Sequence, residues 1–280
     1  MPKNTISPAD LAAYRRRLEE LEKSPSTIAA YMRAAAGFAG WLSGRELDRR
    51  EAAAWKAALA SSGLATATVN CRVAALNSLL SFLGREDCRV KTLRRQRRLF
   101  CSEGRELRRG EYERLVRSAR ESGDETLAMI METICATGIR VGELRFITVE
   151  SLHCGTAEIL LKGKARTVML PTRLRSRLAK YAAKRRVHSG AVFLGRRGPL
   201  SRKTVWERMK ALCAAAGVEP GKVFPHNLRH LFAREFYRAS RDVAKLADVL
   251  GHSSLDTTRI YLVSTGAEHR AMLDRLRLIC

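Results

Sequence analysis

The sequence has no run that approaches the roughly 18–20 apolar residues a membrane-spanning helix needs. Its first residues, MPKNTISPADLAAYRRR, lack the apolar core of a secretory signal. Seven cysteines are scattered along the chain without a CxxC pair, which disfavours a zinc module and indicates reduced thiols. These absences predict a cytoplasmic protein with no membrane partner.

Acidic residues are also scarce: 28 Asp and Glu stand against 52 Lys and Arg in 280 residues, a formal net charge of +24. The excess occurs both in the first hundred residues and in the remainder, so it is not a detachable tail. Such a surplus indicates a polyanionic partner, most often nucleic acid, although a solubility device or a membrane surface gives the same composition. No GxxxxGK[ST] loop and no carboxylate cluster of the metal-nuclease type accompanies it.

The length suits about two domains, each able to bury a core. Residues 1–90 show helical periodicity and no strand pattern, which predicts a helical domain with a first helix that begins at Ser7-Pro8. The predicted helices are 8–21, 27–42, 52–59 and 66–83. In the last of these, one face carries Val69, Val73, Leu76, Leu79, Leu80 and Leu83.

Residues 91–108 are strongly basic with few core candidates, which predicts a linker, either solvated or lying against phosphates. Residues 109–280 are mainly helical with a small antiparallel sheet. Its two strands, 157–161 and 166–170, flank a predicted hairpin turn at Lys162–Ala165. The predicted helices here are 109–122, 125–137, 173–186, 203–215, 227–239, 241–250 and 255–263, followed by a tail helix over about 266–279.

Four motifs in this second part gather residues that bind or transfer phosphate. Each is weak alone, because such residues more often lie on a solvated surface or in a core, so the case depends on their combination. The motifs are TGIRVGEL with Arg140 and Glu143, the hairpin turn with Lys162 and Lys164, PHNLRH with His226, Arg229 and His230, and LGHSSLDTTRIY with His252 and Tyr261.

Two arginines, a lysine, histidines and a tyrosine suit phosphoryl transfer onto tyrosine. Guanidinium groups match the charged non-bridging oxygens of a five-coordinate phosphate and stay charged at working pH. A tyrosine hydroxyl needs a base or a cationic field to act as a nucleophile near neutrality. The leaving 5′ oxygen needs a proton, which lysine or histidine can supply. This set requires no metal and no other cofactor.

In order and spacing these motifs resemble those of the tyrosine recombinases, or phage-type integrases, in particular the compact two-domain Xer-like kind. The stretches ATGIRVGELRFI, HNLRHLFA and LGHSSLDTTRIYL carry the resemblance, and the two helical stretches SPSTIAAYMRAAAGFAGWL and ATATVNCRVAALNSLLSFL resemble the helices of the family's core-DNA-binding domain. The resemblance implies a core-DNA-binding domain over 1–90, a linker over 91–108 and a mixed α/β catalytic domain with a C-terminal tail helix over 109–280.

The resemblance also implies roles for individual residues. Tyr261 corresponds to the nucleophile, and the lysine of the hairpin corresponds to the general acid. Lys162 matches that lysine best, but the stretch from Lys162 to Pro171 is one residue shorter than the family pattern, so Lys164 remains an alternative. The remaining catalytic candidates are Arg140, His226, Arg229 and His252, with Glu143 and His230 in supporting positions.

The function implied is site-specific recombination through a 3′-phosphotyrosyl intermediate, with strands exchanged between two duplexes without ATP or metal. The partners implied are double-stranded DNA with a specific site and three further protomers, identical or related, in a nucleoid-associated tetramer. The tail, with Met272, Leu273, Leu276 and Ile279 on one face, is expected to dock on its own domain or on a neighbouring protomer. Two alternatives share this fold or chemistry: a non-catalytic DNA-binding regulator and relaxation of DNA by a type IB topoisomerase-like protein.

Overall fold

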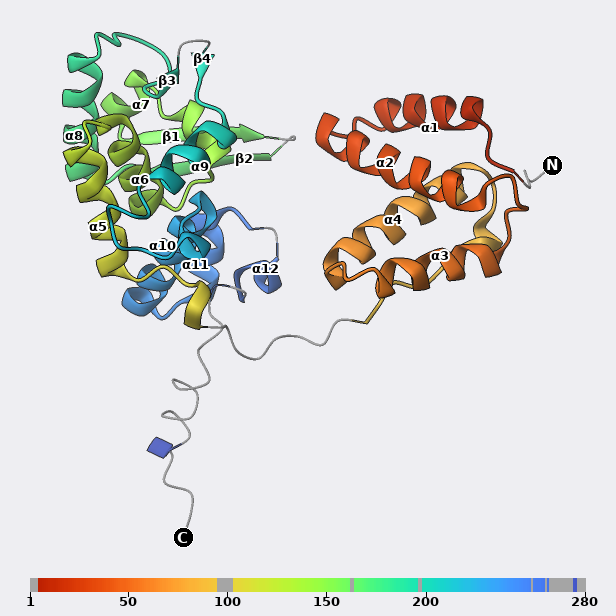
Figure 1. The fold of residues 1–280 in the computed structure, drawn as a ribbon. Helices are drawn as coiled ribbons and strands as arrows, with labels where there is room; N and C mark the ends of the chain where they lie inside the picture. The colour runs from red at the N-terminus through yellow and green to blue at the C-terminus, as the bar shows by residue number, and fades with distance from the viewer. Residues whose placement is uncertain are drawn as a thin grey trace. The chain divides into compact units, whose positions relative to one another are not determined.

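The computed structural model describes residues 5–94, 103–161, 164–195, 198–252, 254–259, 261 and 274–275. The chain divides into two compact units, Met1–Arg97 and Arg98–Cys280 (Figure 1). The division falls within the basic segment 91–108. Over the described residues, no helix combines the length and the apolarity needed to cross a bilayer.

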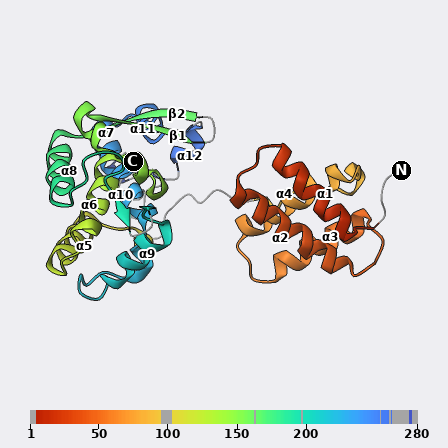
Figure 2. The same ribbon diagram turned by 90° about the horizontal axis from the view of Figure 1, so that it is seen from above.

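In the described residues of the first unit, 5–94, there are four α-helices, α1 (Pro8–Glu20), α2 (Pro25–Leu42), α3 (Arg49–Ser61) and α4 (Thr66–Phe82) (Figure 2). The start of α1 follows from its local sequence. The Ser7 hydroxyl accepts a hydrogen bond from the Asp10 backbone N–H, and the Asp10 carboxylate accepts one from the Ser7 N–H at 3.0 Å. This reciprocal pair forms a capping box, which satisfies two of the backbone donors left free at the start of a helix.

The core of the first unit forms where the apolar faces of the four helices meet. All six residues of the predicted apolar face of α4 are buried, which confirms that prediction. The rings of Phe38 in α2 and Trp55 in α3 meet edge to face with their centroids 5.3 Å apart. The ring centroids of Tyr14 in α1 and Phe82 in α4 are 5.5 Å apart. Burial of these large rings supplies much of the apolar area that stabilises so small a unit.

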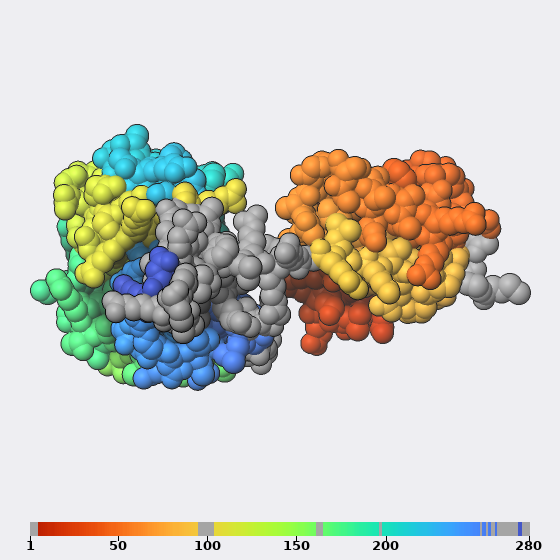
Figure 3. Space-filling model, turned by 90° about the horizontal axis from the view of Figure 1, so that it is seen from below, coloured from red at the N-terminus to blue at the C-terminus, as the bar shows by residue number. Residues whose placement is uncertain are grey.

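Two asparagines of α4, seven residues apart and therefore on one face, hold the segment that leaves this helix. Asn77 donates to the Val90 carbonyl at 2.8 Å and accepts from the Val90 N–H at 3.0 Å. Asn70 makes the same pair of bonds to Leu93, at 3.0 and 2.8 Å. The segment after α4 therefore lies along the unit (golden in Figure 3) with its backbone polar groups satisfied by side chains.

The second unit is mainly helical with two small hairpins (Figure 1). This agrees with the predicted fold class. Its elements are α5 (Arg109–Glu121), α6 (Glu125–Thr137), α7 (Val149–Cys154), β1 (Thr156–Leu161), β2 (Lys164–Met169), α8 (Thr172–Lys184), β3 (Leu194–Gly195), β4 (Gly198–Pro199), α9 (Arg202–Ala211), α10 (Pro225–Ser240), α11 (Val243–Leu250) and α12 (Leu255–Arg259).

Three features of the second unit differ from the sequence prediction. The ladder pairs Leu161 with Lys164 and Leu160 with Ala165, so Lys164 and Ala165 belong to β2 and the connection is two residues, not four. Neither α7 nor the pair β3–β4 was predicted. Helix α12 ends at Arg259, and most of the predicted remainder of this helix, like the tail except for 274–275, lies outside the described residues.

Helix α6 forms the centre of the second unit and packs against α5 and α10. Its residues Leu127–Met131 are all buried, so little of its circumference faces solvent. The helix ends where Gly138 adopts a left-handed conformation, φ 66°, and α11 ends in the same way at Gly251, φ 64°. Both helix ends lie beside α10, and the candidate site residues follow directly from them.

We predict that Asn77→Ala lowers the free energy of unfolding by about 1–3 kcal/mol, because the substitution leaves the Val90 N–H and C=O without their partner. Native-state hydrogen exchange on the full chain localises the effect: the Val90 amide loses protection. Thr68→Ala, at an exposed position of the same helix, serves as the control. Unchanged protection of Val90 in the Asn77 variant would contradict the assignment.

Candidate active site

Arg140 stands at the start of the short 3₁₀ helix Val141–Phe146, three residues after Thr137, the last residue of α6. Glu143 fixes it twice: one carboxylate oxygen accepts from the Arg140 backbone N–H at 2.8 Å, and the other accepts from its Nη1 at 2.9 Å. Glu143 is only 2% exposed, whereas the Arg140 side chain is 44% exposed. The acid is therefore a buried anchor, and the arginine remains open to a ligand.

Arg166 of β2 is a second partner of Glu143, and the sequence motifs did not identify it. Its Nη2 donates to Glu143 at 2.6 Å and its Nη1 donates to the Val249 carbonyl at 2.9 Å. A Cβ on Gly251 would clash with Arg166 Cδ. Arg166 thus joins the hairpin to the 3₁₀ helix and to the end of α11. The sequence contained one indication that Arg166 points into the unit. Arg166 lies on the same face of the strand as Val168, whose side chain is buried.

Burial alone raises the pKa of the Glu143 carboxyl, but its partners reverse this effect. The Arg140 backbone N–H and the positive charges of Arg166 and Arg140 hold the pKa of Glu143 below its usual value. Glu143 is therefore ionised at neutral pH. One buried carboxylate thus orients two guanidinium groups.

Arg229 of α10 is almost completely buried, with 1% of its surface exposed. It donates to the Gly138 carbonyl at the end of α6, and its Nη2 donates to the Leu250 carbonyl at 2.8 Å and to His252 Nε2 at 3.0 Å. Its buried Nε has no hydrogen-bond partner within the described part of the chain. Desolvation and the neighbouring Arg140 lower the pKa of Arg229 to about 10, so it is still charged at neutral pH.

Tyr261 is buried at the centre of three histidine rings. Its ring centroid lies 4.4 Å from His230, 5.6 Å from His252 and 6.0 Å from His226. Its ring is stacked nearly parallel to that of His252, at 14°. Tyr261 is 3% exposed and packs against Ala233, Leu246 and Leu250. The structure therefore brings together Arg140, Glu143, His226, Arg229, His230, His252 and Tyr261.

All three histidines are held in the neutral form. Desolvation, followed by the charges of Arg229 and Arg140, lowers the pKa of His226 and brings that of His252 to about 4. Desolvation, His226 and Arg229 likewise lower the pKa of His230 to about 4. A cluster with this much uncompensated positive charge favours an anion as its ligand, because an anion offsets the repulsion among the cations.

The two lysine candidates are placed less completely. Lys162 lies outside the described residues, and Lys164 is the first residue of β2. Arg166 follows Lys164 by two residues in the same strand, so the hairpin that carries both lysines is tied to Glu143. The choice between Lys162 and Lys164 stays a prediction.

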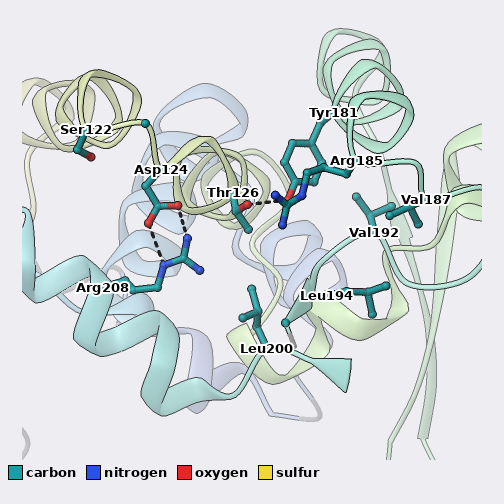
Figure 4. A pocket seen from close by; sticks show the side chains of 12 residues that line it. Ser122, Asp124, Thr126, Tyr181, Arg185, Val187, Val192, Leu194, Leu200 and Arg208 are labelled. Carbon is teal, nitrogen blue, oxygen red and sulfur yellow. Dashed lines mark hydrogen bonds and ion pairs between the residues drawn. The ribbon is translucent and has the colours of Figure 1, made fainter. Parts of the chain in front are cut away.

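The second unit also contains a hollow of about 670 Å³ between the α5–α6 turn, the end of α8 and the β3–β4 hairpin (Figure 4). On its wall Arg208 forms an ion pair with Asp124, and the Thr126 and Tyr181 hydroxyls are 2.8 Å apart. None of the candidate site residues that the structure describes lines this hollow. The clustered cations and the tyrosine thus lie in another part of the unit.

Comparison with models of known protein families identifies the family to which the chain belongs. The model described as "Phage integrase family" matches residues 105–268, and the one described as "Phage integrase, N-terminal SAM-like domain" matches residues 11–87. The chain belongs to the phage integrase family. The two family matches together cover both structural units.

Proteins similar to this chain include tyrosine recombinases. The chain is 31% identical to tyrosine recombinase XerC of Erythrobacter litoralis over 90% of this chain and 80% of that protein. It is 29% identical to tyrosine recombinase XerA of Thermococcus kodakarensis over 92% and 91%. A shorter stretch, 54% of each chain, is 31% identical to XerA of Pyrococcus furiosus.

Among solved structures, a λ integrase dimer bound to a COC′ core site matches with a TM-score of 0.72 and 20% identity, over 92% of this chain and 77% of that one. XerH recombinase bound to its difH substrate matches with a TM-score of 0.67 and 19% identity, over 97% and 90%. At these identities the likeness shows the shared fold.

The neutral histidines generate a prediction about stability. Between pH 6.5 and 4 the unfolded chain binds protons at positions 230 and 252 that the folded site does not bind, so stability falls as the pH decreases through this window. We expect the melting temperature of His252→Gln to decrease less than that of the wild type between pH 7 and pH 5. The exposed His188→Gln serves as the control and is expected to follow the wild type. Equal decreases in all three proteins would contradict the prediction.

Proposed function

We propose that this integrase-family enzyme is a site-specific DNA recombinase that uses Tyr261 to cleave and rejoin strands of two duplexes through a 3′-phosphotyrosyl intermediate. The observation that carries the proposal is the position of Tyr261, in one cluster with His226, His230, His252 and the buried Arg229. No ATP is required, because the energy of the broken phosphodiester is kept in the phosphotyrosine. No metal is required, because the cations of the site are side chains.

In the cleavage step the Tyr261 oxygen attacks the scissile phosphorus, a P–O(Tyr) bond forms and the P–O5′ bond breaks. Arg140 and Arg229 neutralise the additional charge on the non-bridging oxygens, and His252 supports the same phosphate. The neutral His226 and His230 rings that flank the phenol are bases available for its proton. The hairpin lysine, Lys162 or Lys164, protonates the leaving 5′ oxygen. Rejoining reverses these steps with a 5′ hydroxyl as the nucleophile.

The partner we propose is double-stranded DNA that carries a recombination site, bound by both units. The net charge of +24 favours this partner, and both parts of the chain contribute to that charge. Four protomers, identical or with a related recombinase, hold two duplexes for strand exchange. With DNA as the partner, the location we propose is the cytoplasm, in association with the nucleoid.

We predict that the wild type forms a covalent protein–DNA complex with a nicked suicide substrate and that Tyr261→Phe forms none, because phenylalanine lacks the attacking oxygen. Denaturing gel electrophoresis measures the complex, and gel-shift affinity of the Phe variant is expected to stay within about twofold. A covalent band from Tyr261→Phe would exclude this mechanism. Site-independent relaxation of supercoils by the wild type would favour the topoisomerase alternative, and unchanged phenotypes of Tyr261→Phe would favour the regulator.

A second prediction separates the two lysines. Replacement of the bridging 5′ oxygen by sulfur gives a leaving group of much lower pKa, which departs without a proton. The general acid is therefore the lysine whose alanine variant cleaves normal DNA at least about tenfold more slowly but cleaves the 5′-thio substrate at the wild-type rate. We expect this for Lys162→Ala, with Lys164→Ala as its matched partner. Loss of both activities in both variants would contradict a general-acid role.

A further inference from the structure

Thr258 lies on α12, three residues before Tyr261, and is completely buried. Its hydroxyl oxygen is 2.9 Å from His252 Nδ1, and its backbone carbonyl accepts a hydrogen bond from the Tyr261 N–H at 3.0 Å. One residue thus contacts both the imidazole of His252 and the turn that carries the tyrosine.

The hydrogen bonds around His252 determine which ring nitrogen carries the proton. Its Nε2 is 3.0 Å from Arg229 Nη2, and a guanidinium can only donate. Nε2 is therefore the acceptor, Nδ1 carries the hydrogen, and the Thr258 oxygen accepts it. The opposite tautomer would direct an N–H of His252 against an N–H of Arg229.

We propose that Thr258 is a positioning residue that holds His252 in its Nδ1–H form and thereby makes the phosphate contact of His252 depend on the docking of the nucleophile's helix. The proposal rests on the recombinase function proposed above. When a phosphate oxygen enters, Nε2 takes up a proton from solvent and donates to that oxygen, in place of accepting from Arg229, while the Nδ1–H bond to Thr258 is kept. Thr258 is thus the fixed partner in both protonation states.

The same contact connects two events in the site. If α12 leaves, the ring of His252 loses its Nδ1 acceptor and Tyr261 leaves at the same time, because the two bonds are made by one residue. His252 is therefore fully oriented only when the tyrosine is in place. A site from which α12 and Tyr261 have left therefore binds the phosphate weakly, because His252 is no longer held in position.

The test uses three variants. Thr258→Val keeps the shape of the side chain and removes the hydroxyl, Thr258→Ser keeps the hydroxyl, and Thr257→Val makes the same substitution at the exposed neighbouring position. We expect single-turnover cleavage by Thr258→Val to be about tenfold slower, as expected for loss of one hydrogen bond to a group that becomes charged, with DNA affinity unchanged. Thr258→Ser is expected to restore the rate, and Thr257→Val to match the wild type. Equal rates for Thr258→Val and Thr257→Val would overturn the proposal.

A double-mutant cycle distinguishes action through His252 from a general effect on folding. In a His252→Ala background, Thr258→Val is expected to cause no further loss, whereas an additional tenfold loss would show that Thr258 acts by another route. The alkaline limb of the pH–rate profile, on which His252 loses its proton, is expected to move to lower pH in Thr258→Val, since the imidazolium loses an acceptor and its pKa falls. The charged and titratable groups that face His252 are the same in all variants: Arg229 and His226 of α10, Arg140, Arg166 of β2, and Tyr261.

A readout without DNA keeps this proposal separate from the proposed function. Side-chain ¹⁵N shifts of His252 in the free protein are expected to report the Nδ1–H tautomer in the wild type and in Thr258→Ser, and a mixture in Thr258→Val. An Nε2–H tautomer in the wild type would overturn the assignment even if cleavage is normal. If the wild type cleaves no DNA, the recombinase function fails and the tautomer still decides the role of Thr258.

Discussion

The arrangement of the site depends on the burial of the Arg229 guanidinium between the ends of two helices. Its hydrogen bonds go to the carbonyls of Gly138 and Leu250, at the C-termini of α6 and α11, where the helix dipole is negative. A buried cation without such partners would cost several kcal/mol. Both helices end at a left-handed glycine, and Arg140 and His252 follow these glycines within two residues. The position of the Arg229 guanidinium therefore also determines the positions of Arg140 and His252.

The charge balance of the site is a second constraint, because it connects stability to ligand binding. Three arginines converge on a region that contains one buried carboxylate, Glu143. Desolvation and, after it, this surplus of positive charge lower the pKa of Arg229 and keep His252 neutral in the free protein. An entering phosphodiester removes this penalty, so part of the electrostatic cost of building the site is returned as affinity for the phosphate.

Local signals in the sequence were sufficient for much of the fold. The cap at Ser7, the apolar face of α4 and the helix-ending glycine before Arg140 each depend on residues within one or two turns, and the structure contains all three. Arg166 could not be assigned in this way, because its partners Glu143 and Val249 lie 23 and 83 residues away. The β3–β4 pair, two residues per strand, is too short to produce a periodic pattern. The length of the β1–β2 turn depends on the ladder register, which composition does not reveal.

The nucleophile Tyr261 belongs to the same chain as the arginines and histidines around it, which limits the role that neighbouring protomers have in forming the site. Tyr261 packs against residues of its own chain and is joined to His252 through Thr258, so one protomer contains the arginines, the histidines and the tyrosine. A neighbouring protomer is therefore not needed to complete this part of the site. In the proposed tetramer, contacts between protomers then act on α12 rather than on the chemistry. A movement of this short helix would withdraw the nucleophile and release His252 together, so such a protomer would neither cleave its phosphate nor hold it with an oriented His252.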